Sequence, residues 1–347
     1  MTTIQPDTTR LRLKLGKIHL QIEKRTIALV IILTVIIVLL SLLSLSTGTI
    51  QFSTQQVFAA LLRNSDNRTE LVIWGIRLPR VVAALIVGSA LGAAGGVFQS
   101  VSRNALGSPD VIGFTTGAAT GAVIEIVFFN LGPIATSLAA ICSGLLTAVI
   151  VYLLARNHGR SGGYRLVLIG IGISAMLSAA NSLILAKGNI DLAIKAQLWL
   201  SGSLNAREWI DVYPALIGMF MFLPLLVFAA RKLDILEMGD EQAQQLGIRI
   251  EAQRFTVMFS GVALTAVSVA TAGPIAFIAL AGPQITRRLT RSGRVQVLSS
   301  ALFGASLLLS ADVLSQNIPV GFALPVGLTT GLIGGMYLLW ILTKENV

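Results

Sequence analysis

The sequence predicts an all-α polytopic membrane protein with about ten transmembrane helices. Of its 347 residues 54% are hydrophobic and only 12% are charged, and the mean hydropathy is +0.80. A soluble domain could not cover so apolar a chain with polar surface. Ten apolar stretches are separated by turn or charge signals. Because lipid offers the backbone no hydrogen-bond partner, these stretches are expected to be helices, whereas a membrane β-barrel would show short alternating segments.

The turn and charge signals mark the spans in order, and together the spans form one membrane domain over residues 27–343. A basic tail, residues 1–26, precedes them, and residues 344–347 follow. The expected spans are 27–46, 79–101, 111–129, 134–155, 165–186, 212–230, 254–272, 274–287, 295–314 and 324–343.

The basic residues orient the bundle. With the N-terminus in the cytoplasm, 19 of the 26 Lys and Arg residues lie on the cytoplasmic side, as the positive-inside rule requires. An even number of spans then places both termini there. The net charge of +10 therefore reflects topology, and nucleic-acid binding is not implied. A single cysteine, Cys142, excludes an intrachain disulfide, and two histidines are too few for a metal or haem site, so no cofactor is expected.

The segment Leu236–Ile248 is a polar island between two apolar regions. Asp240 and Glu241 suit a helix N-terminus, Ala243 and Leu246 would share one helix face, and Gly247 suits a left-handed C-terminal stop. The segment is too charged and too short to span the membrane, and too short to be a stable helix alone. It is either a helix that binds a soluble partner or a capped surface loop.

Two arginines, Arg77 and Arg80, lie one helical turn apart at the outer end of the second span. Their guanidinium groups could pair with an acidic partner protein, or they could simply snorkel to the interface. The preceding outer loop, residues 47–76, is long enough for a short interfacial helix. The alternating tail from Arg10 to Leu20 suits either an anionic lipid surface or a mere orienting role.

Small residues at four-residue spacing predict close helix packing in three spans. They are Gly88, Gly92, Gly95 and Gly96, then Gly113, Gly117 and Gly121, and finally Gly327, Gly331 and Gly335.

Two irregular segments interrupt the spans. Residues 102–110 form a tight polar turn with Gly107 and Pro109. Residues 272–284 contain two prolines in a short apolar run, which predicts a broken helix buried in protein or lining a cavity. The acids Glu125 and Asp312 lie near the outer ends of their spans, where snorkelling or helix pairing explains them better than a proton relay.

These segments together resemble the iron-siderophore and cobalamin permeases of bacterial ATP-driven importers, the type II ABC importers. The resemblance runs from about Trp74 to Leu342. Within the family it is strongest to the second permease subunit of ferric-enterobactin importers. Its landmarks are Arg77-Leu78-Pro79-Arg80, Asn104-Ala105-Leu106-Gly107-Ser108-Pro109-Asp110, Leu236 to Gly247, Ala272 to Pro283 and Leu324-Pro325-Val326-Gly327.

The resemblance implies a cobalamin-importer-like fold of ten helices in the bacterial cytoplasmic membrane. It implies four kinds of neighbour: two cytoplasmic ATP-binding subunits, a second permease subunit of different sequence, an extracytoplasmic substrate-binding protein, and lipid. It also implies residue roles: binding-protein docking by Arg77 and Arg80, a cytoplasmic gate of Asn104, Leu106, Gly162 and Gly163, and ATPase coupling by Leu236, Gly239, Asp240, Glu241, Ala243, Leu246 and Gly247.

Two positions depart from the family pattern. Gln316 stands where some relatives carry a third outer arginine, and Gln284 stands where a Pro-His pair is usual. Docking could therefore be asymmetric between the two permease subunits, and a role for that histidine is unsupported in this chain.

The expected function is translocation of a ferric siderophore, of the catecholate class, without catalysis by this chain. No P-loop occurs, so ATP hydrolysis belongs to a partner. Permeases for cobalamin, haem or hydroxamate siderophores remain alternatives. An ion-coupled secondary transporter would need buried acids near the membrane midplane. An intramembrane enzyme would need a base near Ser201-Gly202-Ser203, where the sequence has no histidine.

Overall fold

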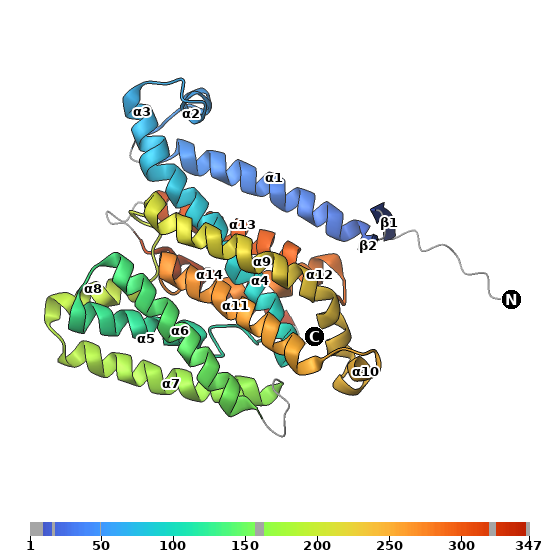
Figure 1. The fold of residues 1–347 in the computed structure, drawn as a ribbon. Helices are drawn as coiled ribbons and strands as arrows, with labels where there is room; N and C mark the ends of the chain where they lie inside the picture. Colours follow the sequence, from blue (N-terminus) through green and yellow to red (C-terminus); the bar gives the residue numbers. More distant parts are fainter. Residues whose placement is uncertain (1–9, 16–17, 49, 157–162, 319–323, 345–347) are drawn as a thin grey trace.

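The structure is a computed structural model that describes residues 10–15, 18–48, 50–156, 163–318 and 324–344. It is a bundle of long helices, and each of the ten expected spans overlaps a helix (Figure 1). Seven helices of the described residues are long and apolar enough to cross a membrane. The spans are α1 (Lys24–Ser46), α4 (Leu78–Ser102), α5 (Phe114–Ile124) continued by the π-helix η2 (Glu125–Phe129), α6 (Pro133–Ala155), α7 (Tyr164–Lys187), α9 (Trp209–Met238), α11 (Ile250–Ala272), α12 (Ile278–Thr290), α13 (Val297–Asn317) and α14 (Val326–Lys344).

Helix α4 is the centre of the bundle, packed against α9, α11, α12 and α13. The 18-residue apolar stretch of the helix that contains α4 is 83% buried, whereas that of the peripheral α1 is 6% buried. Glycine spacing explains this position: a Cβ at Gly88, Gly92 or Gly95 would overlap a backbone carbonyl of α12 or α13. The close packing predicted for this span is therefore confirmed.

Helix α14 only partly follows the same prediction. A Cβ at Gly327 would overlap the carbonyl oxygen of Ser201, whereas one at Gly331 or Gly335 would meet no described atom within 4 Å. Gly334, one residue before the predicted position, faces the Phe277 ring instead. Gly331 and Gly335 thus lie on a helix face that the described residues leave open to close approach.

Several short elements lie at the two ends of the bundle. At one end are α2 (Thr54–Leu61), α3 (Asn67–Val72), the π-helix η1 (Ile73–Arg77) and α8 (Ile190–Leu200), and at the other is α10 (Asp240–Gln245) (Figure 1). Helices α2 and α3 confirm that the outer loop is helical in part. We call these ends the α8 end and the α10 end.

The basic tail contains a two-stranded antiparallel hairpin, which the all-α prediction had not anticipated. Strand β1 (Arg10–Leu15) pairs with β2 (Ile18–Glu23), and Arg10 lies opposite Glu23. The period-two alternation of this segment is the pattern typical of a strand. The hairpin precedes α1 and leaves the helical bundle unchanged.

The break between α11 and α12 packs against protein, as predicted, although not completely: Gly273 and Ile275 are buried, and Ala276 is exposed. Here the amide of Ser203 donates to the carbonyl of Ala272 at 2.7 Å, and the amide of Gly327 donates to that of Gly202 at 3.1 Å. Three chain segments therefore satisfy one another's backbone groups where no helix does so.

Candidate coupling and gating site

The predicted coupling segment is two helical pieces rather than one helix. Helix α9 continues without interruption to Met238, and Gly239 (φ 133, ψ 150) separates it from the six-residue α10. Of the two alternatives, a helix or a capped surface loop, the segment is mostly helical, but Gly239 with its positive φ interrupts the helix. Gly247 has φ 77, so the predicted left-handed stop is present.

The segment presents apolar side chains in two directions. Leu236 and Ala243 are buried in the main hydrophobic core, whereas Met238 is 69% and Leu246 67% exposed. The expectation that Ala243 and Leu246 share a face was wrong, because α10 ends at Gln245 and Leu246 already has non-helical dihedral angles. One side of the segment is therefore anchored, and the other carries two exposed apolar side chains.

Asp240 joins three parts of the chain. Its Oδ1 accepts a hydrogen bond from Arg103 at 2.6 Å and from Arg254 at 2.7 Å. Arg103 lies just after α4 and also donates to the carbonyl of Leu236 at 2.9 Å. Arg254 in α11 pairs in addition with Glu251 at 3.3 Å. The sequence assigns Asp240 a place at a helix N-terminus and, through the family resemblance, a part in ATPase coupling, but it predicts neither of the ion pairs of Asp240 with these two arginines.

The predicted gate residues Asn104 and Leu106 lie in a tight turn beside Arg103. The Asn104 side-chain oxygen accepts the amide of Leu106 at 2.9 Å, and its carbonyl accepts that of Gly107 at 2.9 Å. Between them, the carbonyl of Ala105 accepts a hydrogen bond from Gln284 Nε2 at 2.6 Å. The Leu106 side chain is exposed. We call residues 103–107 the gate turn.

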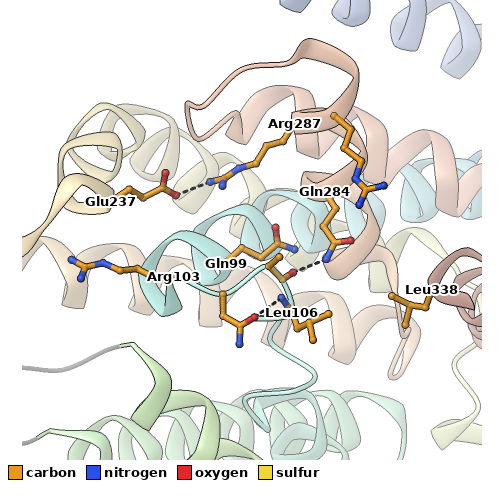
Figure 2. Close-up of a pocket in the computed structure, with 10 residues that line it drawn as sticks. Gln99, Arg103, Leu106, Glu237, Gln284, Arg287 and Leu338 are labelled. Carbon is orange, nitrogen blue, oxygen red and sulfur yellow. Dashed lines mark hydrogen bonds and ion pairs between the residues drawn. The ribbon is translucent and has the colours of Figure 1, made fainter. Parts of the chain in front are cut away.

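The gate turn borders a cavity of about 760 Å³ at the α10 end (Figure 2). Its volume lies in the ordinary range for ligand cavities, ~300–1,000 Å³. Glu237 of α9 and Arg287 of α12, both in its lining, form an ion pair at 2.6 Å. The lining is rich in amide and guanidinium groups: Gln99, Arg103, Asn104, Ala105, Leu106, Glu237, Gln284, Arg287, Arg288 and Leu338.

Of the two remaining gate candidates, one is described. Gly163 lies immediately before α7, with φ 66, and its amide donates to the carbonyl of Val101 at 3.3 Å. It therefore touches the end of α4 next to the gate turn. Gly162 lies outside the described residues. No group of three or more His, Cys, Asp and Glu residues that could hold a metal occurs in the described ranges.

The two arginines predicted to dock a binding protein lie at the α8 end, and both have partners within the chain. Arg77 donates to the carbonyls of Leu45, at 2.6 Å, and of Ile50, and its guanidinium lies 4.8 Å from the Phe52 ring centroid. Arg80 forms an ion pair with the buried Asp312 at 2.8 Å. Their role in docking stays a prediction.

Comparison with known proteins gives a consistent result. The profile of the FecCD transport family matches residues 34–344. The chain is 40% identical over 325 residues to the ferric enterobactin transport system permease protein FepG of Escherichia coli K12, covering 94% of this chain and 98% of the relative. It is 35% identical to the Fe(3+)-citrate import system permease protein YfmE of Bacillus subtilis, covering 93% and 97% of the two chains.

The iron(3+)-hydroxamate import system permease protein FhuG of Bacillus subtilis is 32% identical to this chain over 90% of its length and 95% of the relative. A solved metal-chelate type ABC transporter in an inward-facing conformation superposes with a TM-score of 0.82 at 27% identity, covering 91% of this chain and 99% of that one. The resemblance inferred from the motifs is confirmed, and the chain belongs to the FecCD transport family.

Proposed function

We propose that this chain is the permease subunit through which an ATP-driven importer moves an intact ferric catecholate siderophore across a bacterial cytoplasmic membrane. The observation that carries the proposal is the 40% identity to FepG over 94% of the chain. Relatives named for ferric citrate and hydroxamate transport are less similar, at 35% and 32%. Those chelates, with cobalamin and haem, are the competing cargoes.

The cavity at the α10 end suits an anionic cargo. A ferric ion held by three doubly deprotonated catechols carries a net negative charge. The cavity is lined by three arginines, Arg103, Arg287 and Arg288, and one acid, Glu237. Guanidinium groups there would attract such a chelate more strongly than a neutral hydroxamate complex. This charge pattern favours an anionic chelate, a class that includes ferric citrate as well as ferric catecholates, over a neutral one.

The energy for transport would come from two ATP-binding subunits bound at the α10 end, on the cytoplasmic side together with both chain termini. Met238 and Leu246, exposed beside the anchored Ala243, form the apolar contact that such a subunit needs. ATP-driven movement of the segment would pass along α9, a single helix of 30 residues, to the membrane core. Transport then proceeds by alternating access.

The remaining partners would bind elsewhere on the chain. The face of α14 that the described residues leave open at Gly331 and Gly335 suits close packing against a second permease subunit. A substrate-binding protein would bind at the α8 end near Arg77 and Arg80, in addition to or in exchange for their contacts within the chain.

An ion-coupled secondary transporter is a weaker explanation. It needs a buried acid available for a proton or a metal ion. Glu125 already accepts hydrogen bonds from the amide of Leu131 and the hydroxyl of Thr136, and Asp312 is paired with Arg80. Both acids thus have structural partners, and so does Asp110 in the loop after α4, which accepts a hydrogen bond from the Thr115 hydroxyl at 2.6 Å.

Uptake measurements test the proposal. In a strain deleted for this gene, uptake of iron-labelled ferric enterobactin, a ferric hydroxamate and ferric citrate is compared with that of labelled cobalamin and haem. Selective loss of ferric enterobactin uptake, restored by the intact chain, is expected. Selective loss of another ligand would reassign the cargo, and uptake that persists after ATP depletion would contradict an ATP-driven importer.

A further inference from the structure

We infer that Asp240 is a positioning residue that ties the gate turn to the coupling segment through Arg103, so that displacement of the segment moves residues 103–107. The inference deepens the proposed function and rests on it. It assigns to Asp240, Arg103 and Gln284 roles that follow from their contacts in this chain.

The first attachment of the gate turn is ionic. Arg103 reaches the coupling segment twice, through the Asp240 carboxylate at 2.6 Å and the Leu236 carbonyl at 2.9 Å. Hydrogen bonds between charged groups at such distances are roughly twice as strong as neutral ones. Arg103 has φ 50, a left-handed conformation that costs a non-glycine residue energy. The contacts to the segment stabilise that conformation, so their loss would free the turn to change shape.

Asp240 itself is fixed on the opposite side by Arg254. The Arg254 side chain is 7% exposed, against 43% for that of Arg103. Arg254 also pairs with Glu251, which accepts a hydrogen bond from the hydroxyl of Tyr152 in α6 at 3.3 Å. The buried Arg254 therefore makes α10 and the start of α11 one unit, and the more exposed Arg103 is the link to the turn.

The second attachment of the gate turn comes from α12. Gln284 donates to the carbonyl of Ala105 at 2.6 Å. Ala105 follows Asn104 in the chain, whereas Arg103 precedes it. Figure 2 shows the Arg103 side chain extending away from the turn on one side, and Gln284 reaching the turn from the other. The turn that carries Asn104 and Leu106 is thus held between the coupling segment and α12. Relative movement of those two elements must deform it, which supplies the two-state element that transmission between sites requires.

A double-mutant cycle tests the link. Arg103→Gln, Asp240→Asn and the double variant are compared for ferric enterobactin uptake and for ATP hydrolysis by the assembled complex. Each single variant is expected to lower uptake by about five-fold or more, the lower end of typical coupling effects, while ATP hydrolysis continues. Because the two residues act through one contact, the double variant should lose no more than the worse single variant.

Three results would overturn the inference: losses that multiply in the double variant, uptake within about two-fold of the parent in each single variant, or loss of the ATP-binding subunits on purification of the Asp240→Asn complex. The last would mean that Asp240 serves assembly rather than the gate turn. The control is Arg156→Gln, which removes an exposed arginine at the end of α6. It is expected to leave uptake unchanged.

A second readout needs no cargo and so separates this inference from the proposed substrate. In a Cys142→Ser background, Leu106→Cys is labelled with a membrane-impermeant maleimide in the complex, with and without ATP. The labelling rate is expected to change with ATP in the parent and to lose that response when Arg103→Gln is added. An equal ATP response in both would contradict the link, whichever chelate the protein carries.

Discussion

The guanidinium of Arg80 in α4 forms a two-armed ion pair with the carboxylate of Asp312 in α13. Nε lies 3.1 Å from both carboxylate oxygens, and Nη2 lies 2.8 Å from Oδ1. Gln316 donates to the other carboxylate oxygen of Asp312, Oδ2, at 2.8 Å. Asp312 is fully buried. In this chain Arg80 therefore fastens the central helix to α13, whatever it contributes to docking.

Asp312→Asn is expected to destabilise the protein by about 3 kcal/mol, because it leaves the largely buried Arg80 guanidinium without a countercharge. Thermal unfolding of the purified protein in detergent measures this effect. Gln316→Ala, which removes only a neutral donor to the same carboxylate, is the matched control and should cost about 1 kcal/mol. Equal stability of Asp312→Asn and the parent would show that the ion pair does not hold α4 against α13.

Gly95→Ala is expected to prevent normal folding, because its Cβ would overlap the carbonyl oxygen of Ala279. Gly331→Ala adds the same methyl group where no described atom lies within 4 Å. Yield of monodisperse protein on size-exclusion chromatography compares the two. Gly331→Ala should retain the yield of this chain alone, and a normal yield of Gly95→Ala would contradict the observed packing of α4.

Asp110, in the loop between α4 and α5, is expected to make stability depend on pH. Burial raises the pKa of Asp110 to about 6 from an ordinary value of 3.8, although hydrogen bonds from Thr115 and the amide of Phe277 act in the opposite direction. Between pH 3.8 and about 6, the folded protein therefore keeps a proton on Asp110 that the unfolded chain has already released. Its contribution to stability is therefore present near pH 4 and is lost as pH rises to about 6.

The melting temperature should accordingly be higher at about pH 5 than at about pH 7. Asp110→Asn keeps an acceptor for the Thr115 hydroxyl but cannot ionise, so it should reduce this difference. A pH dependence identical in variant and parent would assign the effect to another group.

Gln284→Ala is expected to loosen the gate turn by removing the donor to Ala105. A neutral hydrogen bond contributes about 1 kcal/mol, so ATP hydrolysis without a binding protein should rise by about five-fold as the turn opens more readily. Gln284→Glu keeps the size of the side chain but, when ionised, cannot donate, and it should behave in the same way. An unchanged basal rate in both variants would remove Gln284 from the gate.

Much of the bundle could be predicted because its signals are local in sequence. Long apolar runs located the spans, and glycines in α4 predicted the close approach to its neighbours. The proline-containing run after α11 predicted the buried break. Gly247 marked the end of the coupling segment. Each of these depends on a residue's own conformational preference or on a period along one helix.

The contacts of the site could not be predicted in this way, because they join residues far apart in the chain. Arg80 and Asp312 are 232 positions apart, and Arg103 and Asp240 are 137 apart. From a single sequence, an arginine at a helix end is assigned to the membrane interface. Nothing in the sequence indicates which distant acid it pairs with. The division of the coupling segment also escaped prediction, since α9 continues through Arg231 and Lys232 as a helix beyond the apolar span.

Retention of the ATP-binding subunits by Leu246→Asp tests whether the coupling segment receives the energy for transport. The exposed Leu246 side chain is expected to lie in the contact with them, so a charge there should abolish their co-purification and ferric enterobactin uptake together. Gln245→Asp places the same charge on the neighbouring exposed residue and should retain both. Unchanged co-purification and transport-coupled ATP hydrolysis in Leu246→Asp would contradict the claim that this segment receives the energy for transport.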